Sequence, residues 1–92
     1  MAKQDQVVLS AVGKNRSGVL AELTAKIAQE GGNIMDIGQK IIGDYFCTLM
    51  MVEIPSHDMF GKFKESLEGL GKEKGYRVFV QHEKVFQKMH RV

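Results

Sequence analysis

The sequence contains no tryptophan, only one proline and only one cysteine among its 92 residues. The lone Cys47 cannot form a disulfide within the chain, and no Cys-x-x-Cys motif is present, so neither an oxidising compartment nor thiol redox chemistry is indicated. The apolar runs are too short to span a membrane, and no apolar stretch of an export signal follows the polar N-terminal residues. We therefore expect a cytoplasmic protein that is neither exported nor embedded in a membrane.

The chain is also short and nearly neutral, with 13 Lys and Arg against 11 Asp and Glu. A chain of this length buries only about two-thirds of the surface that its unfolded form exposes, so a large enclosed active site would have to form between subunits. We expect a single domain over residues 1–92, with its core at residues 7–81 and a C-terminal tail at residues 82–92.

The C-terminal third is the basic part of the chain, since residues 61–92 hold eight Lys and Arg and four Asp and Glu. A basic segment is compatible with nucleic-acid binding, but these charges alternate in sign, which is typical of a solvated helix face. An RNA-recognition motif would need aromatic side chains on its central strands, and residues 45–52 lack that pattern. RNA binding is therefore a less favoured alternative, and we expect no nucleic-acid partner.

The hydrophobic pattern predicts four strands and two helices in the order βαββαβ. The strands are expected at residues 7–13, 33–42, 45–54 and 76–81, and the helices at residues 17–30 and 56–74. Ser17 and Ser56 are the candidate N-caps, while Gly31 with Gly32, and Gly75, are the candidate helix ends. The dipeptide Gly43-Asp44 predicts a tight hairpin between the two middle strands.

This element order predicts the ferredoxin-like fold of the α+β class, a four-stranded antiparallel sheet with both helices on one face. A short C-terminal helix is expected in the tail, where Val85, Phe86 and Met89 recur at helical spacing.

Both faces of the predicted sheet are apolar. In the strand at residues 45–54, Phe46, Met50 and Val52 alternate with Tyr45, Cys47, Leu49 and Met51, whereas a sheet with helices on one side normally has a polar second face. The strand at residues 33–42 is expected at a sheet edge and is rich in isoleucine, and such an edge tends to pair. We expect the tail, a second copy of the chain, or both to cover this surface, and we predict a homodimer or a larger homo-oligomer.

The loop after the first strand, Gly13-Lys14-Asn15-Arg16-Ser17-Gly18, is the most informative local motif. Glycines allow close approach of the backbone, and the amide groups at the start of a helix favour an anion such as a carboxylate or a phosphate. The loop is not a Walker A motif, because Val19-Leu20 stand where a Lys and a Ser or Thr would be required.

Residues 13–39, GKNRSGVLAELTAKIAQEGGNIMDIGQ, resemble the signature of the ACT domain, a small-molecule-sensing module of amino-acid metabolism. The similarity extends to small stand-alone ACT proteins, glycine-cleavage regulatory proteins and the N-terminal domain of formyltetrahydrofolate deformylases. The resemblance implies a ligand, typically an amino acid, bound between subunits near the first loop and the second strand. Carried over by position, the ligand-binding candidates are Asn15, Arg16, Ser17, Gly18, Asn33, Ile34 and Asp36.

These residue types fit an amino-acid zwitterion. The helix start, together with Arg16, can hold the carboxylate, and Asn33 and Asp36 can accept hydrogen bonds from the ammonium group. Asn15 departs from the aspartate common in the family, which leaves the ligand class open. A structural reading of the same residues also stays open, in which Ser17 only caps the helix, Asn33 only occupies a left-handed turn and Asp36 only protects a strand edge.

We predict no metal site, no cofactor and no catalytic site. His57, His82 and His90 lack the spacing of metal ligands, Cys47 has no obvious histidine base, and the carboxylates show no acid-base pairing. The sequence thus predicts a regulatory domain, not an enzyme, that senses an amino acid at a dimer interface and modulates a separate partner protein by coupling. The alternative from another class is a ligand-free dimerisation or protein-interaction module.

Overall fold

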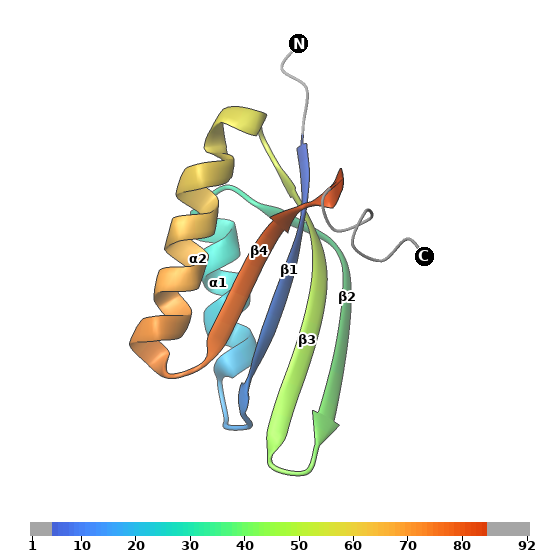
Figure 1. Ribbon diagram of the computed structural model, residues 1–92, viewed down its shortest axis with the longest axis vertical. Coiled ribbons are helices and arrows are strands. Elements are labelled where there is room, and N and C mark those ends of the chain that lie inside the picture. The colour runs from blue at the N-terminus through green and yellow to red at the C-terminus, as the bar shows by residue number, and fades with distance from the viewer. Residues whose placement is uncertain (1–4, 85–92) are drawn as a thin grey trace.

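The computed structural model describes residues 5–84 as a four-stranded antiparallel sheet with two helices on one of its faces (Figure 1). In chain order the elements are β1 (Asp5–Lys14), α1 (Val19–Gln29), β2 (Asn33–Ile42), β3 (Tyr45–Ile54), the 3-10 turn η1 (His57–Met59), α2 (Phe60–Lys74) and β4 (Arg77–His82). The predicted ferredoxin-like fold is confirmed. The predicted tail helix involves Val85, Phe86 and Met89, which lie outside the described residues.

The strands lie in the order β2-β3-β1-β4, so β2 and β4 are the edges. β1 pairs with β3 over its whole length, from Asp5 opposite Ile54 to Lys14 opposite Tyr45. The predicted hairpin is also confirmed, because β2 and β3 are joined by only two residues and Gly43 has a φ of +61°. A bulge at Met35 interrupts the pairing of β2 with β3 between Ile34 and Asp36.

The core lies between the sheet and the two helices. Alternate residues of β1 and β3 face it, and so do the apolar stripes of the helices; its members include Val7, Leu9, Ala11, Leu23, Ile27, Phe46, Met50, Val52, Phe63 and Leu67. Each large aliphatic or aromatic side chain buried in this way contributes about 1.5–3 kcal/mol of transfer free energy. The Phe46 and Tyr76 rings meet edge to face, with centroids 5.7 Å apart, at the end of the sheet where β4 begins.

The start of α1 differs from the prediction. Gly18, not Ser17, is the N-cap, with a φ of +89° that suits glycine, and no side chain of residues 5–84 makes a capping hydrogen bond. Ser56 precedes η1 rather than α2 and also makes no capping hydrogen bond. The prediction for the other end of α1 is confirmed, since Gly31 N–H donates to Ala28 O and Gly32 N–H donates to Ile27 O in a Schellman arrangement.

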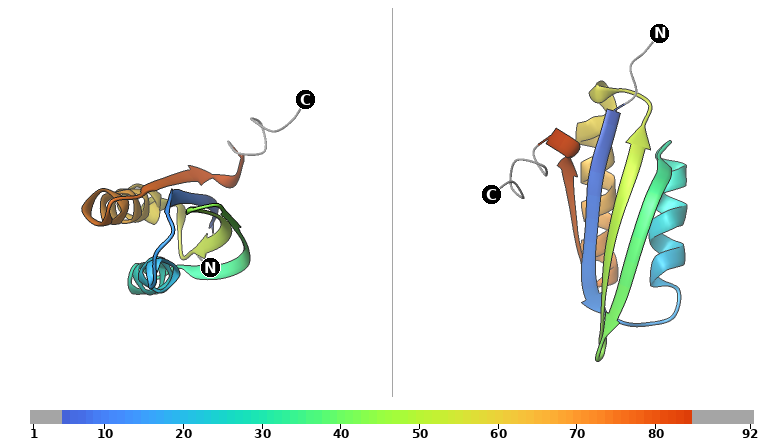
Figure 2. Two further views of the ribbon diagram at one scale, coloured as in Figure 1. Left: turned by 90° about the horizontal axis from the view of Figure 1, so that it is seen from below. Right: turned by 90° about the vertical axis from the view of Figure 1, so that its right-hand side faces the viewer.

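Figure 2 shows that both helices lie on one face of the sheet. The opposite face carries exposed apolar side chains. Val12, Tyr45, Leu49 and Phe79 are all more than two-fifths exposed. β2 is exposed on both of its faces, because the helices do not extend over this edge: Ile37 and Ile41, on the helix side, are 42% and 53% exposed. The sheet therefore has an apolar face and an apolar edge without a covering element among the described residues.

Candidate functional site

The loop at residues 15–18 joins β1 to α1 at the end of the sheet that also carries the β2–β3 turn. The Asn15 N–H donates to Asp44 O at 2.7 Å, which fixes the loop against that turn. Gly18 O then accepts the first helical hydrogen bond, from Glu22 N–H at 2.9 Å. Within the described part of the chain no side chain caps α1, so the amide groups of its first turn have no capping partner there, and such groups favour an anion.

Arg16 is held by an acidic side chain of α1. Its guanidinium lies 3.0 Å and 3.4 Å from the two carboxylate oxygens of Glu22 and 6.0 Å from the centre of the Tyr76 ring. The hydrogen bond from Arg16 lowers the pKa of Glu22, and burial opposes this only in part. For Arg16 to hold a ligand carboxylate, the ligand must therefore compete with Glu22 for the guanidinium.

Tyr76 completes this group, because its hydroxyl lies 3.4 Å from Glu22 Oε1. Burial of the phenol and the negative charge of Glu22 raise the pKa of Tyr76 to about 12. Glu22 and Tyr76 were not predicted from the sequence as part of the site, because neither lies in the loop motif. Their contact depends on packing of the β4 end against the first turn of α1.

The second group of candidates lies at the start of β2. The Asn33 side-chain amide points to Met35 Sδ at 3.4 Å, and Asp36 Oδ1 accepts a hydrogen bond from Ile37 N–H at 2.9 Å. Asn33 is not in a left-handed conformation, since every described residue with positive φ is a glycine, so that structural explanation of Asn33 was wrong. Ile34 is partly buried and packs against the core.

The two groups lie at opposite ends of the sheet in one chain. Asp36 pairs with Met51, and Met51 pairs with Val8, whereas the loop follows the far end of β1. The seven residue-to-residue steps from Val8 to Asn15 span about 23 Å at the rise of a strand. A single chain therefore does not bring Asn33 and Asp36 to the loop, and a site built from both groups needs a second copy.

Asp36 lines a shallow cavity of about 270 Å³ beside β2. Its other walls are mainly apolar: Val8, Ile37, Gly38, Leu49, Met50 and Met51. The hollow exists partly because Gly38 has no side chain, and a Cβ there would have no neighbour within 4 Å among residues 5–84. In the sequence the only signal for this hollow is the placement of Gly38 between Asp36 and Lys40 on one strand face.

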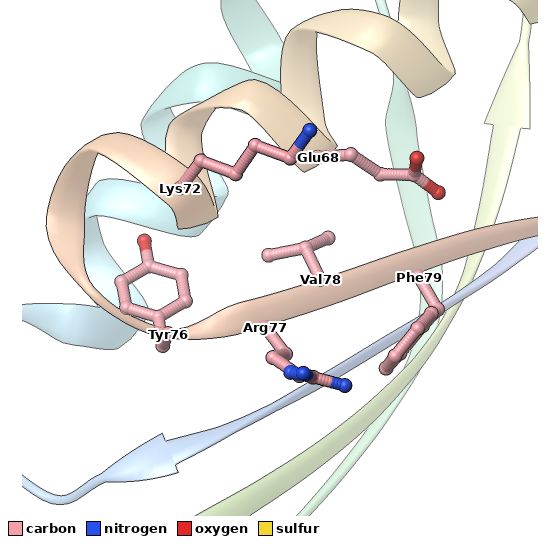
Figure 3. Close-up of a pocket in the computed structure, with 6 residues that line it drawn as sticks. All are labelled: Glu68, Lys72, Tyr76, Arg77, Val78 and Phe79. Atoms are coloured by element: carbon pink, nitrogen blue, oxygen red, sulfur yellow. The ribbon is translucent and has the colours of Figure 1, made fainter.

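A second hollow, of about 340 Å³, lies between α2 and the edge strand β4 (Figure 3). Glu68 and Lys72 border it from the helix, and Tyr76, Arg77, Val78 and Phe79 border it from the strand side. Glu68 Oε2 is already paired with Lys64 Nζ at 2.6 Å and with Val80 N–H at 3.1 Å. This hollow was not predicted from the sequence, and none of the predicted site residues lines it.

Within residues 5–84, the helices fall short of the length and apolar character that a membrane span requires.

Comparison with known proteins places residues 5–81 within a family model described as an ACT domain. A UPF0237 protein of Methanococcus maripaludis is 42% identical over 90 residues, which cover 96% of this chain and 99% of the relative. An ACT domain protein from Streptococcus pneumoniae superposes with a TM-score of 0.80 at 28% identity, and the match covers 89% of this chain and 93% of that one.

Two further solved structures are similar over part of their length. One is assigned as a glycine cleavage system transcriptional repressor, with a TM-score of 0.80 and 25% identity; the match covers 87% of this chain and 46% of that one. The other is a formyltetrahydrofolate deformylase from Pseudomonas putida, with a TM-score of 0.74 over 84% of this chain and 28% of that one. At 13% identity, the deformylase shows the shared fold alone.

Proposed function

Because this chain belongs to the ACT domain family, we propose that it binds an amino acid between two copies of itself and thereby regulates a separate partner protein. The observation that carries the proposal is the separation of the candidate residues, which lie at opposite ends of one sheet. A second copy related by a two-fold axis can bring the two groups together.

We propose that the two copies pair through the β2 edges. β2 is a ten-residue edge strand that is exposed along most of its length, and such an edge presents unpaired N–H and C=O groups to a second strand. In a full-length antiparallel pairing, Asn33 of one copy lies opposite Ile42 of the other. The loop at residues 15–18 is fixed beside that end of β2 by the Asn15 to Asp44 hydrogen bond, so the Asn33 end of one copy faces the loop of the other.

The chemistry of the composite site suits a zwitterion. The uncapped amide groups of α1 and the Arg16 guanidinium favour the carboxylate. Asn33 and Asp36 of the other copy offer oxygen atoms to the ammonium group. Binding would then stabilise one arrangement of the two copies over others, and a partner that senses this arrangement would respond to the ligand.

A thermal-unfolding screen of the purified protein against the twenty amino acids, each at millimolar concentration, tests the proposal. A ligand present at 100 times its dissociation constant adds about 2.7 kcal/mol to the unfolding free energy, which is a shift of roughly 10–20 °C for a domain of this size. The shift should disappear in Asn33→Ala and persist in Gln39→Ala, which removes an exposed amide from the same strand outside the candidate set.

If no amino acid shifts the midpoint while the protein remains a dimer, the ligand-free interaction module is favoured instead. The apolar face and edge of the sheet are the observations that support this second candidate.

A further inference from the structure

Asp5, His57 and His82 form a cluster that the sequence analysis did not predict. Asp5 begins β1, His57 begins η1 and His82 ends β4, so three elements contribute one residue each. The three elements meet at the end of the sheet away from the β2–β3 turn (Figure 1). The cluster is therefore far from the loop at residues 15–18 and separate from the proposed amino-acid site.

The side chains of the cluster are in direct contact. His57 Nδ1 lies 2.9 Å from Asp5 Oδ2, and His82 Nε2 lies 2.7 Å and 2.8 Å from the two oxygens of Asp5. The imidazole rings of His57 and His82 meet edge to face, with centroids 5.7 Å apart. Two imidazole nitrogens and one carboxylate thus converge on one point.

We propose that Asp5, His57 and His82 bind one divalent transition-metal ion of the zinc type. One ligand atom from each residue lies within 4.8 Å of the other two. Tetrahedral bonds of 2.0–2.1 Å place ligand atoms about 3.3 Å apart. The histidine nitrogens now lie 2.7–2.9 Å from the Asp5 oxygens, so these atoms need to separate only slightly to hold an ion. Small side-chain rotations, with no movement of the strands, are enough to form the site.

The surroundings of the three ligands favour a site with an open coordination position. The side chains of Asp5 and His82 are only 18% and 19% exposed, whereas His57 is 77% exposed. The strands therefore hold two ligands, and His57 can adjust its ring without disturbing the core. Three protein ligands leave a position for water or a small ligand on the solvent side.

The ligand types select the class of metal. Imidazole with a single carboxylate suits zinc and its neighbours, whereas magnesium and calcium prefer oxygen ligands alone and copper(I) prefers thiolates. Cys47 cannot contribute, because it pairs with Val12 and Lys40 near the other end of the sheet.

Metal binding breaks one hydrogen bond of the metal-free chain. His82 Nδ1 accepts a hydrogen bond from Lys84 N–H at 3.2 Å, and a metal on Nε2 requires the proton on Nδ1 instead. That exposed hydrogen bond must therefore be given up when the metal binds. Each bound ion also replaces the protons that the His57 and His82 nitrogens share with Asp5.

The experiment is a zinc titration of the full chain, with the dissociation constant and stoichiometry measured by calorimetry. We expect one ion per chain, and an unfolding midpoint raised by about 10 °C or more at 100 times the dissociation constant. Cobalt(II) used as a spectroscopic probe should give visible absorption bands without a thiolate charge-transfer band.

The variants separate the proposed site from general zinc binding. His57→Gln changes the most exposed ligand, so it should fold normally yet bind zinc at least about tenfold more weakly. Asp5→Asn should also weaken zinc binding. Asp58→Asn and Cys47→Ser are matched controls at described residues outside the cluster, and they should bind zinc as the wild-type chain does.

The metal-induced shift is compared with the metal-free midpoint of each variant, so a purely structural effect of a substitution cancels. Equal zinc affinity in His57→Gln and the wild-type chain would overturn the proposal. So would loss of binding in Asp58→Asn or Cys47→Ser, or no detectable zinc binding by the wild-type chain.

Discussion

The hydroxyl of Tyr76 lies 3.4 Å from Glu22 Oε1, and this contact links the start of α1 to the residue that precedes β4. The same carboxylate holds the guanidinium of Arg16. The loop arginine that the proposed function assigns to the ligand is therefore part of a preformed group of three side chains. Any carboxylate that binds at the start of α1 must exchange with Glu22 for the guanidinium.

The first prediction concerns the ionisation of Tyr76. In a Tyr45→Phe chain Tyr76 is the only tyrosine, so ultraviolet absorbance reports its titration alone. We expect a midpoint near pH 12, because burial and the Glu22 charge raise the pKa of Tyr76, against about 10 for the chain unfolded in urea. Since the folded pKa is the higher one, stability should fall as the pH rises from about 10 towards 12.

The variant Glu22→Gln tests whether the charge of Glu22 contributes to the raised pKa of Tyr76. Removing the carboxylate charge should lower the pKa of Tyr76 in the folded chain. A Tyr76 midpoint that is the same in folded and unfolded protein would contradict the contact between Tyr76 and Glu22.

The second prediction compares two glycines of α2. A Cβ at Gly71 would lie 2.5 Å from Tyr76 O and 2.9 Å from Val78 Cγ2, whereas a Cβ at Gly69 would have no described neighbour within 4 Å. Gly71→Ala should therefore lower the free energy of unfolding by about 1–3 kcal/mol, and Gly69→Ala should raise it by up to about 1 kcal/mol. Urea unfolding measures both, and a stabilising Gly71→Ala would show that α2 and β4 are not packed this closely.

The third prediction concerns a hydroxyl in the core. Thr48 is fully buried on β3, and its Oγ1 has no hydrogen-bond partner among residues 5–84. Thr48→Val keeps the shape and removes the polar atom, so it should leave stability unchanged or raise it by about 1 kcal/mol. Thr24→Val is the matched control, since the Thr24 hydroxyl donates to Ala21 O and its loss should not stabilise the chain. A large loss of stability in Thr48→Val would mean that the hydroxyl has a partner.

The fourth prediction identifies the surface that joins the two copies. Ile37 and Ile41 are exposed on the edge strand β2, so the double variant Ile37→Lys/Ile41→Lys places like charges on both copies of the proposed interface. Light scattering should find a monomer at concentrations where the wild-type chain is a dimer. Val12→Lys, at an exposed position of β1 on the helix-free face, should remain a dimer. A double variant that stays dimeric, together with a Val12→Lys chain that becomes monomeric, would place the interface on the helix-free face.

The fold could be predicted from the sequence because the patterns that identify its strands and turns are local. Alternation of apolar residues identified the strands, and Gly43 next to Asp44 identified the hairpin. The N-cap was misplaced because serine is the more common cap, whereas a left-handed residue was needed at that position and only glycine adopts it easily.

The arrangement of the candidate sites could not be predicted, because it depends on long-range pairing. Asn33 and Arg16 are close in the sequence, yet the register of β1, β2 and β3 places them at opposite ends of the sheet. Conversely, Asp5 and His82 are 77 residues apart, and the pairing of β1 with β4 brings them into contact. The resemblance to the family motif therefore indicated the candidate residues of the loop and of β2, but not which of them meet.

The most direct test of the proposed function is a complementation experiment with two variants that each lose amino-acid binding. Arg16→Ala removes the loop side of the site, and Asn33→Ala removes the β2 side. If each site takes its loop from one copy and its β2 from the other, a mixed dimer of the two variants contains one intact site.

The measurement is the number of amino-acid sites per chain after equal amounts of the two variants are unfolded together and refolded. Random pairing makes half of the dimers mixed, so about a quarter of the wild-type number of sites should return. No recovery of binding in the mixture, with dimers present, would contradict a site that is shared between two copies.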